Sequence, residues 1–403
     1  MKILLVNKYW YPRGGCERVV LATKELLEGA GHTVAVFGMN DPRNLFTNEY
    51  FIDNIDYRHD RGAKKIRNAF KFIYNFDARE KFLRLARDFR PDVIHFHNIY
   101  HQLSYSLLPA AKELNIPMVM TLHDYKMISP NYNLFHHGKI DESAISGNYW
   151  KCLTKNCLEN FWRSALAAAE AYFRKWKKWE LLVDAYIAPS DFLKKKFLQA
   201  GWEENKLRTI IYPCAVPGVE NSPRADQTVV FFGRLAPEKG IEVLLGAARR
   251  TPELNYQIIG TGPLADQIKN IIAINNLANV HLLGHLNGAE LWRRVATAGL
   301  VVVPSLWYET GGPLTVAEAL LSGTPVIASA IGSIPEILPP AMLVPPNDAE
   351  SLARKIKEWF AQPDLEKNNI ISDLQKKTKE KYDPQLYLKK LEDLYGRVVI
   401  KEV

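Results

Sequence analysis

The sequence predicts an α/β protein built of two doubly wound domains that face each other across a cleft. Three observations support this fold class. Continuous apolar runs alternate with helical patterns, as parallel strands covered on both faces require. The alternation restarts after a Pro-rich stretch at residues 212–227, which is typical of a linker. With 403 residues, the chain is also too long for one ordinary hydrophobic core.

Apolar runs in the first half predict strands, and the amphipathic segments between them predict helices. A strand at 2–7 leads through a turn into a helix at 16–28. The further strands expected here lie at 33–37, 92–97, 117–123, 185–188 and 208–212. Together these elements predict an N-terminal domain of residues 1–215.

The second half repeats the alternation. Its expected strands lie at 228–232, 256–259, 280–283, 300–303 and 325–328. Its expected helices lie at 241–249, 264–275, 289–298, 349–360 and 383–394. We therefore expect a C-terminal domain of residues 216–380, with ligands bound at the carboxyl ends of the strands. Residues 381–403 are expected to form a helix that packs back on the N-terminal domain.

Composition narrows the class of protein. The hydrophobic content of 47% and the charged content of 24% are typical of a soluble globular protein. No apolar run reaches the ~20 residues of a membrane span, and the N-terminus reads as a strand rather than a signal peptide. The four cysteines make no disulfide framework, which fits a cytoplasmic protein. The net charge of +8 favours acidic partners such as nucleotide phosphates or an anionic membrane surface over nucleic acid.

The most informative stretch is a glycine-rich elbow at residues 301–319. An apolar strand ends there, the chain turns through Gly311 and Gly312, and a helix is expected to begin near Pro313. A helix start presents unpaired N–H groups that suit a phosphate. Glu309 and Glu318 flank this anion site, where carboxylates can accept hydrogen bonds from hydroxyls. The elbow therefore predicts a site for a sugar nucleotide, which carries hydroxyls on both sides of a diphosphate.

A second candidate motif follows the first strand of the second half. Arg234 and Lys239, next to Gly233, are expected near the carboxyl end of that strand, where two cations can neutralise a diphosphate. A solvated surface pair is the alternative interpretation. The order of glycine and lysine differs from that of a Walker motif.

Three further motifs end predicted strands. Gly14-Gly15 opens the first helix and lets backbone N–H groups approach an anion, although a plain tight turn explains it equally well. The segment containing Gly262 matches G-x-G-x-x-A, but it lies in the middle of a domain and lacks the ribose-binding acid, so we interpret it as a turn near the nucleotide. His123-Asp124 lies at a strand end, where either cleft chemistry or a helix cap and a packing histidine are expected.

No metal site is predicted. The sequence has no D-x-D motif, and neither its histidines nor its cysteines have a recognised metal-ligand spacing. A bound diphosphate would then depend on Arg234, Lys239 and helix N-termini. We therefore expect neither a metal nor another cofactor.

A long helix is expected from Phe161 to Val183, with aromatic residues and alanines at 3,4 spacing and lysines off the stripe. The stripe consists of Trp162, Ala165, Ala169, Tyr172, Trp176, Trp179 and Val183. Such a helix either packs on its own domain or lies on a membrane surface. The basic, aromatic stretch at 64–90 leaves the same two interpretations open, a solvated face or a peripheral membrane contact.

These features together resemble the retaining glycosyltransferases of the two-Rossmann-domain (GT-B) class, specifically family 4, the glycosyl transferases group 1. The resemblance spans nearly the whole chain. It rests on the order and spacing of the matching motifs, which are Gly14-Gly15, His123-Asp124, Gly233-Arg234, Lys239-Gly240, Gly260-Thr261-Gly262-Pro263 and the elbow from Pro304 to Ala319.

The resemblance implies a role for each matched residue. Arg234 and Lys239 would bind the donor diphosphate, helped by Gly15 and by the backbone amides of Leu314 and Thr315. Glu318 would hold the ribose, Glu309 would hold hydroxyls of the donor sugar, and His123 would approach that sugar. The acceptor would enter from the N-terminal domain.

One departure concerns the two glutamates. The family pattern is E-x7-E, whereas eight residues separate Glu309 from Glu318. One interpretation is that Gly311 or Gly312 loops out as an inserted residue, because glycine tolerates unusual dihedrals. The other is that Thr310 takes the place of the carboxylate.

The resemblance implies a metal-independent retaining glycosyltransferase. It would move a sugar from a UDP- or GDP-linked donor to a lipid-linked or saccharide acceptor in cell-surface glycan synthesis. The enzyme would be cytoplasmic and peripheral at the inner membrane face. Two alternatives remain at this point, a sugar-nucleotide epimerase of the same fold and a non-catalytic nucleotide-sugar binder.

Overall fold

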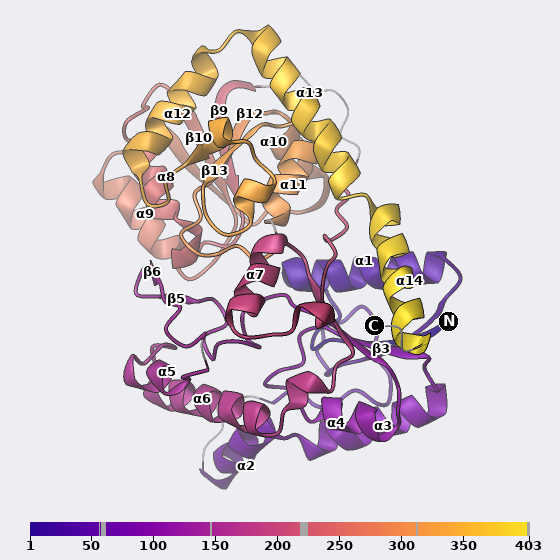
Figure 1. The fold of residues 1–403 in the computed structure, drawn as a ribbon. Coiled ribbons are helices and arrows are strands. Elements are labelled where there is room, and N and C mark those ends of the chain that lie inside the picture. Colours follow the sequence, from indigo (N-terminus) through magenta and orange to yellow (C-terminus); the bar gives the residue numbers. More distant parts are fainter. Residues whose placement is uncertain (56, 58–61, 146, 218–224, 312, 401–403) are drawn as a thin grey trace. The chain divides into compact units, whose positions relative to one another are not determined.

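The structure, a computed structural model, describes residues 1–55, 57, 62–145, 147–217, 225–311 and 313–400 (Figure 1). The chain divides into two compact units. The N-terminal unit consists of Met1–Leu134, Asp141–Pro213 and Pro384–Val403, and the C-terminal unit of Phe135–Ile140 and Cys214–Asp383. No helix among the described residues is long and apolar enough to cross a membrane.

The N-terminal unit contains a parallel sheet with the strand order β2-β1-β3-β4-β7-β8. The strands are β1 (Lys2–Val6), β2 (Thr33–Phe37), β3 (Val93–Phe96), β4 (Met118–Thr121), β7 (Ala185–Ala188) and β8 (Leu207–Thr209). Consecutive residues of β1, such as Ile3 and Leu4, are both fully buried. Because successive side chains of a strand point to opposite faces, both faces of this sheet are covered.

Eight helices among the described residues belong to this unit. They are α1 (Gly15–Gly29), α2 (Gly62–Ile73), α3 (Phe76–Phe89), α4 (Leu107–Glu113), α5 (Trp150–Thr154), α6 (Phe161–Trp176), α7 (Asp191–Gln199) and α14 (Pro384–Ile400). Three of them begin at a polar cap whose side chain accepts a backbone N–H bond: Asn75 for α3, Asn160 for α6 and Ser190 for α7.

The last helix, α14, packs within the N-terminal unit although it comes from the opposite end of the sequence. Its Tyr387 hydroxyl lies 2.8 Å from Thr23 Oγ1 of α1, and its Tyr395 hydroxyl lies 2.7 Å from His95 Nδ1 of β3. Both tyrosines are buried together with Leu391. The helix therefore stabilises the unit that contains the chain's N-terminus.

Two features of this unit differ from the expectations drawn from sequence. A disulfide, which the cysteine count did not anticipate, joins Cys152 of α5 to Cys157 in the segment before α6. In addition, α6 ends at Trp176 instead of continuing to Val183, because Lys178 adopts a left-handed conformation and a short 3₁₀ helix, η1 (Trp179–Leu181), follows. Four basic residues, Arg174, Lys175, Lys177 and Lys178, lie within the five residues 174–178 at this break.

The C-terminal unit contains a second parallel sheet with the strand order β11-β10-β9-β12-β13-β14. Its strands are β9 (Ala225–Phe232), β10 (Asn255–Ile259), β11 (Val280–Gly284), β12 (Ala298–Val303), β13 (Val326–Ser329) and β14 (Leu343–Val344). Its helices are α8 (Ile241–Ala248), α9 (Ala265–Ile274), α10 (Gly288–Ala296), α11 (Leu314–Leu321), α12 (Ala349–Ala361) and α13 (Asp364–Lys381). A two-stranded hairpin, β5 (Phe135–His136) and β6 (Lys139–Ile140), is grouped with this unit.

The strand orders locate the expected ligand sites. In a doubly wound sheet, ligands bind at the carboxyl ends of the two strands between which the order reverses. In the N-terminal unit these strands are β1 and β3, and in the C-terminal unit they are β9 and β12. Both units have the doubly wound parallel sheet that the sequence predicted, and part of the linker, residues 218–224, lies outside the described residues.

Candidate functional site

The candidate site in the C-terminal unit begins where β9 and β12 end. Gly233 and Arg234 directly follow β9, and a short 3₁₀ helix, η3 (Pro237–Lys239), leads into α8. The elbow at 304–313 follows β12 and leads into α11. The two loops thus lie at the point where the strand order reverses, which is where a doubly wound sheet binds its ligand.

The central contact between the two loops is an ion pair. Lys239 Nζ donates to Glu309 Oε1 at 2.7 Å, and Ser305 Oγ donates to the same oxygen at 2.7 Å. The ammonium group also lies 5.2 Å from the centre of the Trp307 ring. Glu309 is buried, whereas 22% of the Lys239 side chain is exposed, so the cation can still reach a ligand.

Backbone contacts fix the positions of the two loops relative to each other. Leu306 N donates to Glu238 O at 2.9 Å. Gly240 has a φ of 67°, and a Cβ at this position would lie only 1.9 Å from Pro304 O. Only glycine fits so close to a carbonyl, so Gly240 fixes the distance between Lys239 and the elbow.

Arg234 extends from the same loop toward solvent. Its guanidinium group contacts the carboxylate of Glu238, which is buried, while 60% of the Arg234 side chain is exposed. The positions of Arg234 and Lys239 match the sequence prediction of two cations at the end of β9. The partner of Arg234, Glu238, was not predicted.

The glycine segment after β10 packs closely on the loop after β9. A Cβ on Gly262 would lie 2.3 Å from Leu235 O, and Leu235 N donates to Thr261 O at 2.9 Å. The segment is therefore a tight turn against the cation-bearing loop. A Cβ on Gly260 would likewise lie 1.9 Å from Gly233 O.

The remaining elbow residues surround the N-terminus of α11. Leu314 and Thr315 form its first two positions after Pro313, and Glu318 lies one turn further on. Glu318 and Thr310 are both buried. Gly312 lies outside the described residues, so the expectation that Gly311 or Gly312 loops out is not decided here.

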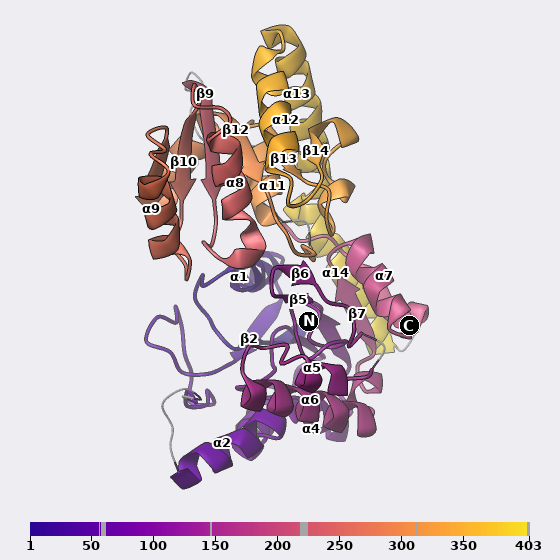
Figure 2. The same cartoon turned by 90° about the vertical axis from the view of Figure 1, so that its left-hand side faces the viewer.

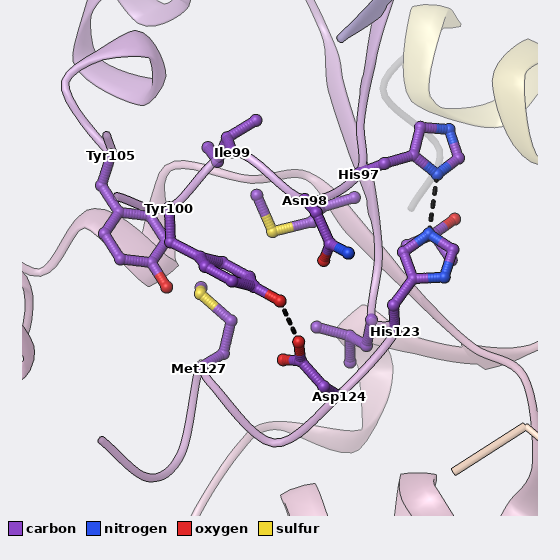
Figure 3. A pocket seen from close by; sticks show the side chains of 11 residues that line it. His97, Asn98, Ile99, Tyr100, Tyr105, His123, Asp124 and Met127 are labelled. Atoms are coloured by element: carbon purple, nitrogen blue, oxygen red, sulfur yellow. Dashed lines mark hydrogen bonds between the residues drawn. The ribbon is translucent and has the colours of Figure 1, made fainter. Parts of the chain in front are cut away.

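His97, His123 and Tyr212 of the N-terminal unit form a chain of hydrogen-bonded rings, and Figure 3 shows the contact between His97 and His123. His97 Nδ1 lies 2.9 Å from His123 Nε2, and His123 Nδ1 lies 2.7 Å from the Tyr212 hydroxyl. Both ring nitrogens of His123 are thus occupied within the protein. Burial lowers the pKa of His123 to about 3, so the ring is neutral at physiological pH.

Asp124 lies on the other side of the same strand end. Its carboxylate accepts a hydrogen bond from the Tyr100 hydroxyl, toward which it points in Figure 3, and another from Lys126 N at 2.8 Å. Burial raises the pKa of Asp124 to about 6, although the Lys126 amide and the cation of Lys8 act in the opposite direction. The cavity between these side chains measures only about 10 Å³, which is room for a single water.

Gly14 and Gly15 lie at the start of α1. Gly14 is the N-cap in an extended conformation, and Gly15 is the first helical residue. Both are exposed, so the first backbone N–H groups of this long helix are accessible. The helix start lies at the carboxyl end of β1, which borders the reversal point of its sheet.

Several residues of these sites were not predicted from sequence. Ser305, Gly332 and Ser333 support Glu309: Ser333 N and Oγ both donate to Glu309 O, at 3.0 and 2.9 Å, and a Cβ on Gly332 would clash with Glu309 N at 2.5 Å. Tyr212 supports His123 in the same way. The only signal in the sequence was that each follows or ends an apolar strand.

No group of three or more His, Cys, Asp or Glu side chains in the described part of the chain is placed to hold a metal ion. The two cysteines nearest His136 and His137 in sequence are joined to each other. His95 and His97 are buried and His101 is half-buried, and desolvation lowers the pKa of each ring.

Comparisons with known proteins agree with this arrangement. The model of "Glycosyltransferase Family 4" matches residues 13–213, and that of "Glycosyl transferases group 1" matches residues 217–377. An "Uncharacterized 42.6 kDa protein in cps region" of Klebsiella pneumoniae is 26% identical over 357 residues, which cover 84% of this chain and 87% of the relative.

Two solved structures share the fold over nearly the full length. Sucrose-phosphate synthase from Thermosynechococcus elongatus has a TM-score of 0.72 at 21% identity and covers 99% of both chains. HepE of Anabaena in complex with UDP has a TM-score of 0.64 at 20% identity, covering 98% of this chain and 100% of its own. Both family models, with these folds, show that the chain belongs to the family 4 glycosyltransferases (glycosyl transferases group 1) of the GT-B class.

Proposed function

We propose that this glycosyltransferase moves a sugar from a UDP- or GDP-linked donor to a lipid-linked or saccharide acceptor, with retention of configuration and without a metal ion. The observation that carries the proposal is the Lys239–Glu309 pair at the reversal point of the C-terminal sheet. It brings together a cation and a carboxylate, a combination that suits a ligand with both anionic phosphate and neutral hydroxyls.

The cations act on the leaving group. In the transfer, the bond from the donor sugar's anomeric carbon to the phosphate oxygen breaks, and a bond from that carbon to the acceptor oxygen forms. The proton of the acceptor hydroxyl passes to the departing phosphate. Lys239 and Arg234, with the amides of Leu314 and Thr315 at the start of α11, stabilise the diphosphate as its charge develops.

The carboxylates and the remaining residues orient the donor. Glu309 accepts hydrogen bonds from sugar hydroxyls, and Glu318 accepts them from the ribose. His123, whose two nitrogens are hydrogen-bonded to His97 and Tyr212, acts as a neutral group that exchanges one of these bonds for a sugar hydroxyl.

The backbone N–H groups at Gly14 and Gly15 of the N-terminal unit supply further anion contacts, as do the turns at Gly233 and Gly262. HepE is described in complex with UDP-glucose as well as UDP, so UDP-glucose is the first donor to test.

We further propose that the enzyme takes part in cell-surface glycan synthesis at the inner membrane face.

Donor screening tests the proposal first. Thermal unfolding of the full chain is followed with UDP-, GDP-, ADP- and dTDP-sugars, because a ligand that binds only the native state raises the melting temperature. The preferred donor is then used in transfer assays with and without EDTA, and the anomeric configuration of the product is read by NMR.

Lys239→Met is expected to lower transfer by at least about 100-fold, the effect of removing a preorganised charge at a transition state. Lys269→Met, an exposed lysine of α9, is the matched control and should leave transfer unchanged. Formation of an isomeric sugar nucleotide without acceptor would instead identify an epimerase. Donor binding with neither hydrolysis nor transfer would identify a non-catalytic binder.

A further inference from the structure

Helix α6 packs on its own domain through its polar and small residues, and its aromatic stripe faces solvent. Trp162 and Trp176 are 75% and 71% exposed, and Tyr172 between them is exposed as well. The buried face consists of Ser164, Ala167, Ala168, Glu170, Ala171 and Arg174. The aromatic residues of the predicted stripe that belong to α6 therefore lie on the surface, whereas Trp179 and Val183, beyond the end of the helix, are buried.

Other exposed aromatic side chains adjoin this stripe. Every exposed Trp and Phe among the described residues comes from α2, the start of α3, α5 or α6; they are Phe70, Phe76, Trp150, Phe161, Trp162 and Trp176. Figures 1 and 2 both show α2, α5 and α6 side by side. We name these six residues together with Tyr172 the aromatic surface.

Ring contacts connect several side chains of the aromatic surface to packed neighbours. Trp176 contacts Phe173, which contacts Trp179, which contacts Tyr74, with ring centres 5.8, 5.3 and 6.0 Å apart, and Tyr74 contacts Phe76 at 4.5 Å. On α5, Trp150 N donates to the Tyr172 hydroxyl at 3.0 Å. The exposed rings are therefore held in place by packed ones, so covering them costs little conformational entropy.

The charge around the aromatic surface is mostly positive. Residues 150–181 contain seven Lys or Arg and three Glu. Two of these glutamates are neutralised by the protein, because Glu170 pairs with Lys126 in the interior and Glu180 pairs with Arg174. Exposed lysines at 175, 177 and 178 remain beside Trp176, and Lys177 Nζ lies 4.4 Å from the centre of its ring.

This chemistry selects one class of occupant. Protein–protein interfaces are depleted in lysine, so a protein partner or a second copy fits poorly. Tryptophan and lysine together are the residues of a membrane–water interface, where the rings enter the headgroup zone and the ammonium groups meet lipid phosphates. From Trp162 to Trp176 the helix rises about 21 Å, which is long enough to lie along a bilayer surface.

We propose that the aromatic surface, with Lys175, Lys177 and Lys178, binds an anionic lipid bilayer, and that α6 lies in the plane of the headgroups. This proposal assigns a surface to the membrane contact in the proposed function. It rests on the proposed function only for the identity of the acceptor. Lipid binding through this surface holds the N-terminal unit at a bilayer, where a lipid-linked acceptor is presented.

The test is co-sedimentation of the full chain with phosphatidylcholine vesicles, with and without phosphatidylglycerol. Wild-type protein should bind the anionic vesicles and release from them as salt increases. Trp162→Ser/Trp176→Ser should weaken binding by about 100-fold, because two large apolar side chains lose their burial. Lys175→Gln/Lys177→Gln/Lys178→Gln should also weaken it by about 100-fold.

Matched controls carry the same changes on the other unit. Ile274→Ser/Leu365→Ser removes two exposed apolar side chains, and Lys376→Gln/Lys377→Gln/Lys379→Gln removes three lysines from α13. Both should bind vesicles as the wild type does. The melting temperature and the donor-induced thermal shift are measured for every variant, so that misfolding or failure of the donor site is recognised independently of lipid binding.

Three outcomes would overturn the proposal. The first is a wild-type chain that binds donor but no anionic vesicle, which leaves the glycosyltransferase function intact. The second is equal binding to neutral and anionic vesicles that the lysine changes do not alter. The third is a dimer, seen by light scattering, that the tryptophan changes dissociate, because the aromatic surface would then be an interface between copies.

Discussion

Lys239 Nζ and Glu309 Oε1 lie 2.7 Å apart, in loops that follow different strands of the C-terminal sheet. The contact bears on the extra residue between the two glutamates of the elbow. If the insertion had displaced the carboxylate, Glu309 would point away from the cation-bearing loop. Instead it is buried against Lys239 and Ser305. We therefore propose that Glu309, and not Thr310, is the sugar-binding residue of the elbow.

Substitution at the two positions separates these interpretations. We expect Glu309→Gln to lower kcat for sugar transfer by about 100-fold or more, because neither the donor hydroxyls nor Lys239 then has a carboxylate partner. Thr310→Val, which keeps the shape of the side chain, should lower it by less than about tenfold. Steady-state transfer assays at saturating donor measure both, and a larger effect at Thr310 would reverse the assignment.

Gly240 is expected to tolerate no side chain. In Gly240→Ala, the new Cβ would overlap Pro304 O, and the residue would keep a φ that L side chains rarely adopt. Relief of the clash must separate the Lys239 loop from the elbow. We therefore expect a loss of at least about 2 kcal/mol in the free energy of unfolding, together with weaker donor binding. Gly29→Ala, at a position with open space, is the control, and urea titration compares the two variants.

Strand positions could be predicted from sequence because apolar runs bounded by turn residues identify strands buried on both faces. Lys2–Val6 and Thr33–Phe37 are found where the pattern placed them. The boundary between α2 and α3 could not be predicted, because the basic, aromatic composition continues across residues 64–90. The division depends on Asn75, whose side chain caps α3 and whose amide donates to Gln102 O.

Periodicity gave the faces of α6 but not which face is buried. The polar face packs inward because the protein supplies partners for its charges, Lys126 for Glu170 and Glu180 for Arg174. Lys126 comes from a distant part of the chain and Glu180 lies beyond the end of α6, so the helical pattern alone could not reveal these partners. The candidate site shows the same limit: Lys239 and Glu309 were predicted separately, whereas their direct contact depends on a close approach of two loops 70 residues apart.

Loss of one partner of the buried Lys126–Glu170 pair should strongly destabilise the N-terminal unit. The two groups lie 2.6 Å apart and are almost completely buried; the contact is an ion pair without the alignment of a good hydrogen bond. Removing one partner leaves a buried charge uncompensated, so Glu170→Met should cost about 3–5 kcal/mol in the free energy of unfolding. Lys126→Met/Glu170→Met removes both charges and should recover most of that loss in urea titrations. A double variant as unstable as the single one would contradict this account.

Acidification should destabilise the N-terminal unit through its buried histidines. Burial lowers the pKa of His95 to about 3, and it lowers that of His97 well below the ordinary value of 6.5. In the folded state these rings stay neutral, whereas in the unfolded state they bind protons below about pH 6.5. Unfolding therefore takes up protons between these two pKa values, and stability falls as the pH falls through that window.

Between pH 7 and pH 5 the loss attributable to His95 is about 2 kcal/mol. His97 acts in the same direction. Asp124 acts in the opposite direction. Its folded-state pKa of about 6 lies above the unfolded value, so protonation of this carboxyl group stabilises the folded state as the pH falls. Over this interval its contribution is only about 1 kcal/mol. The net result is a less stable protein at pH 5. Urea titrations at both pH values measure the difference, which His95→Gln should reduce by about 2 kcal/mol, since the amide does not titrate. Equal stability at the two pH values, or greater stability at pH 5, would show that the rings are protonated in the folded state.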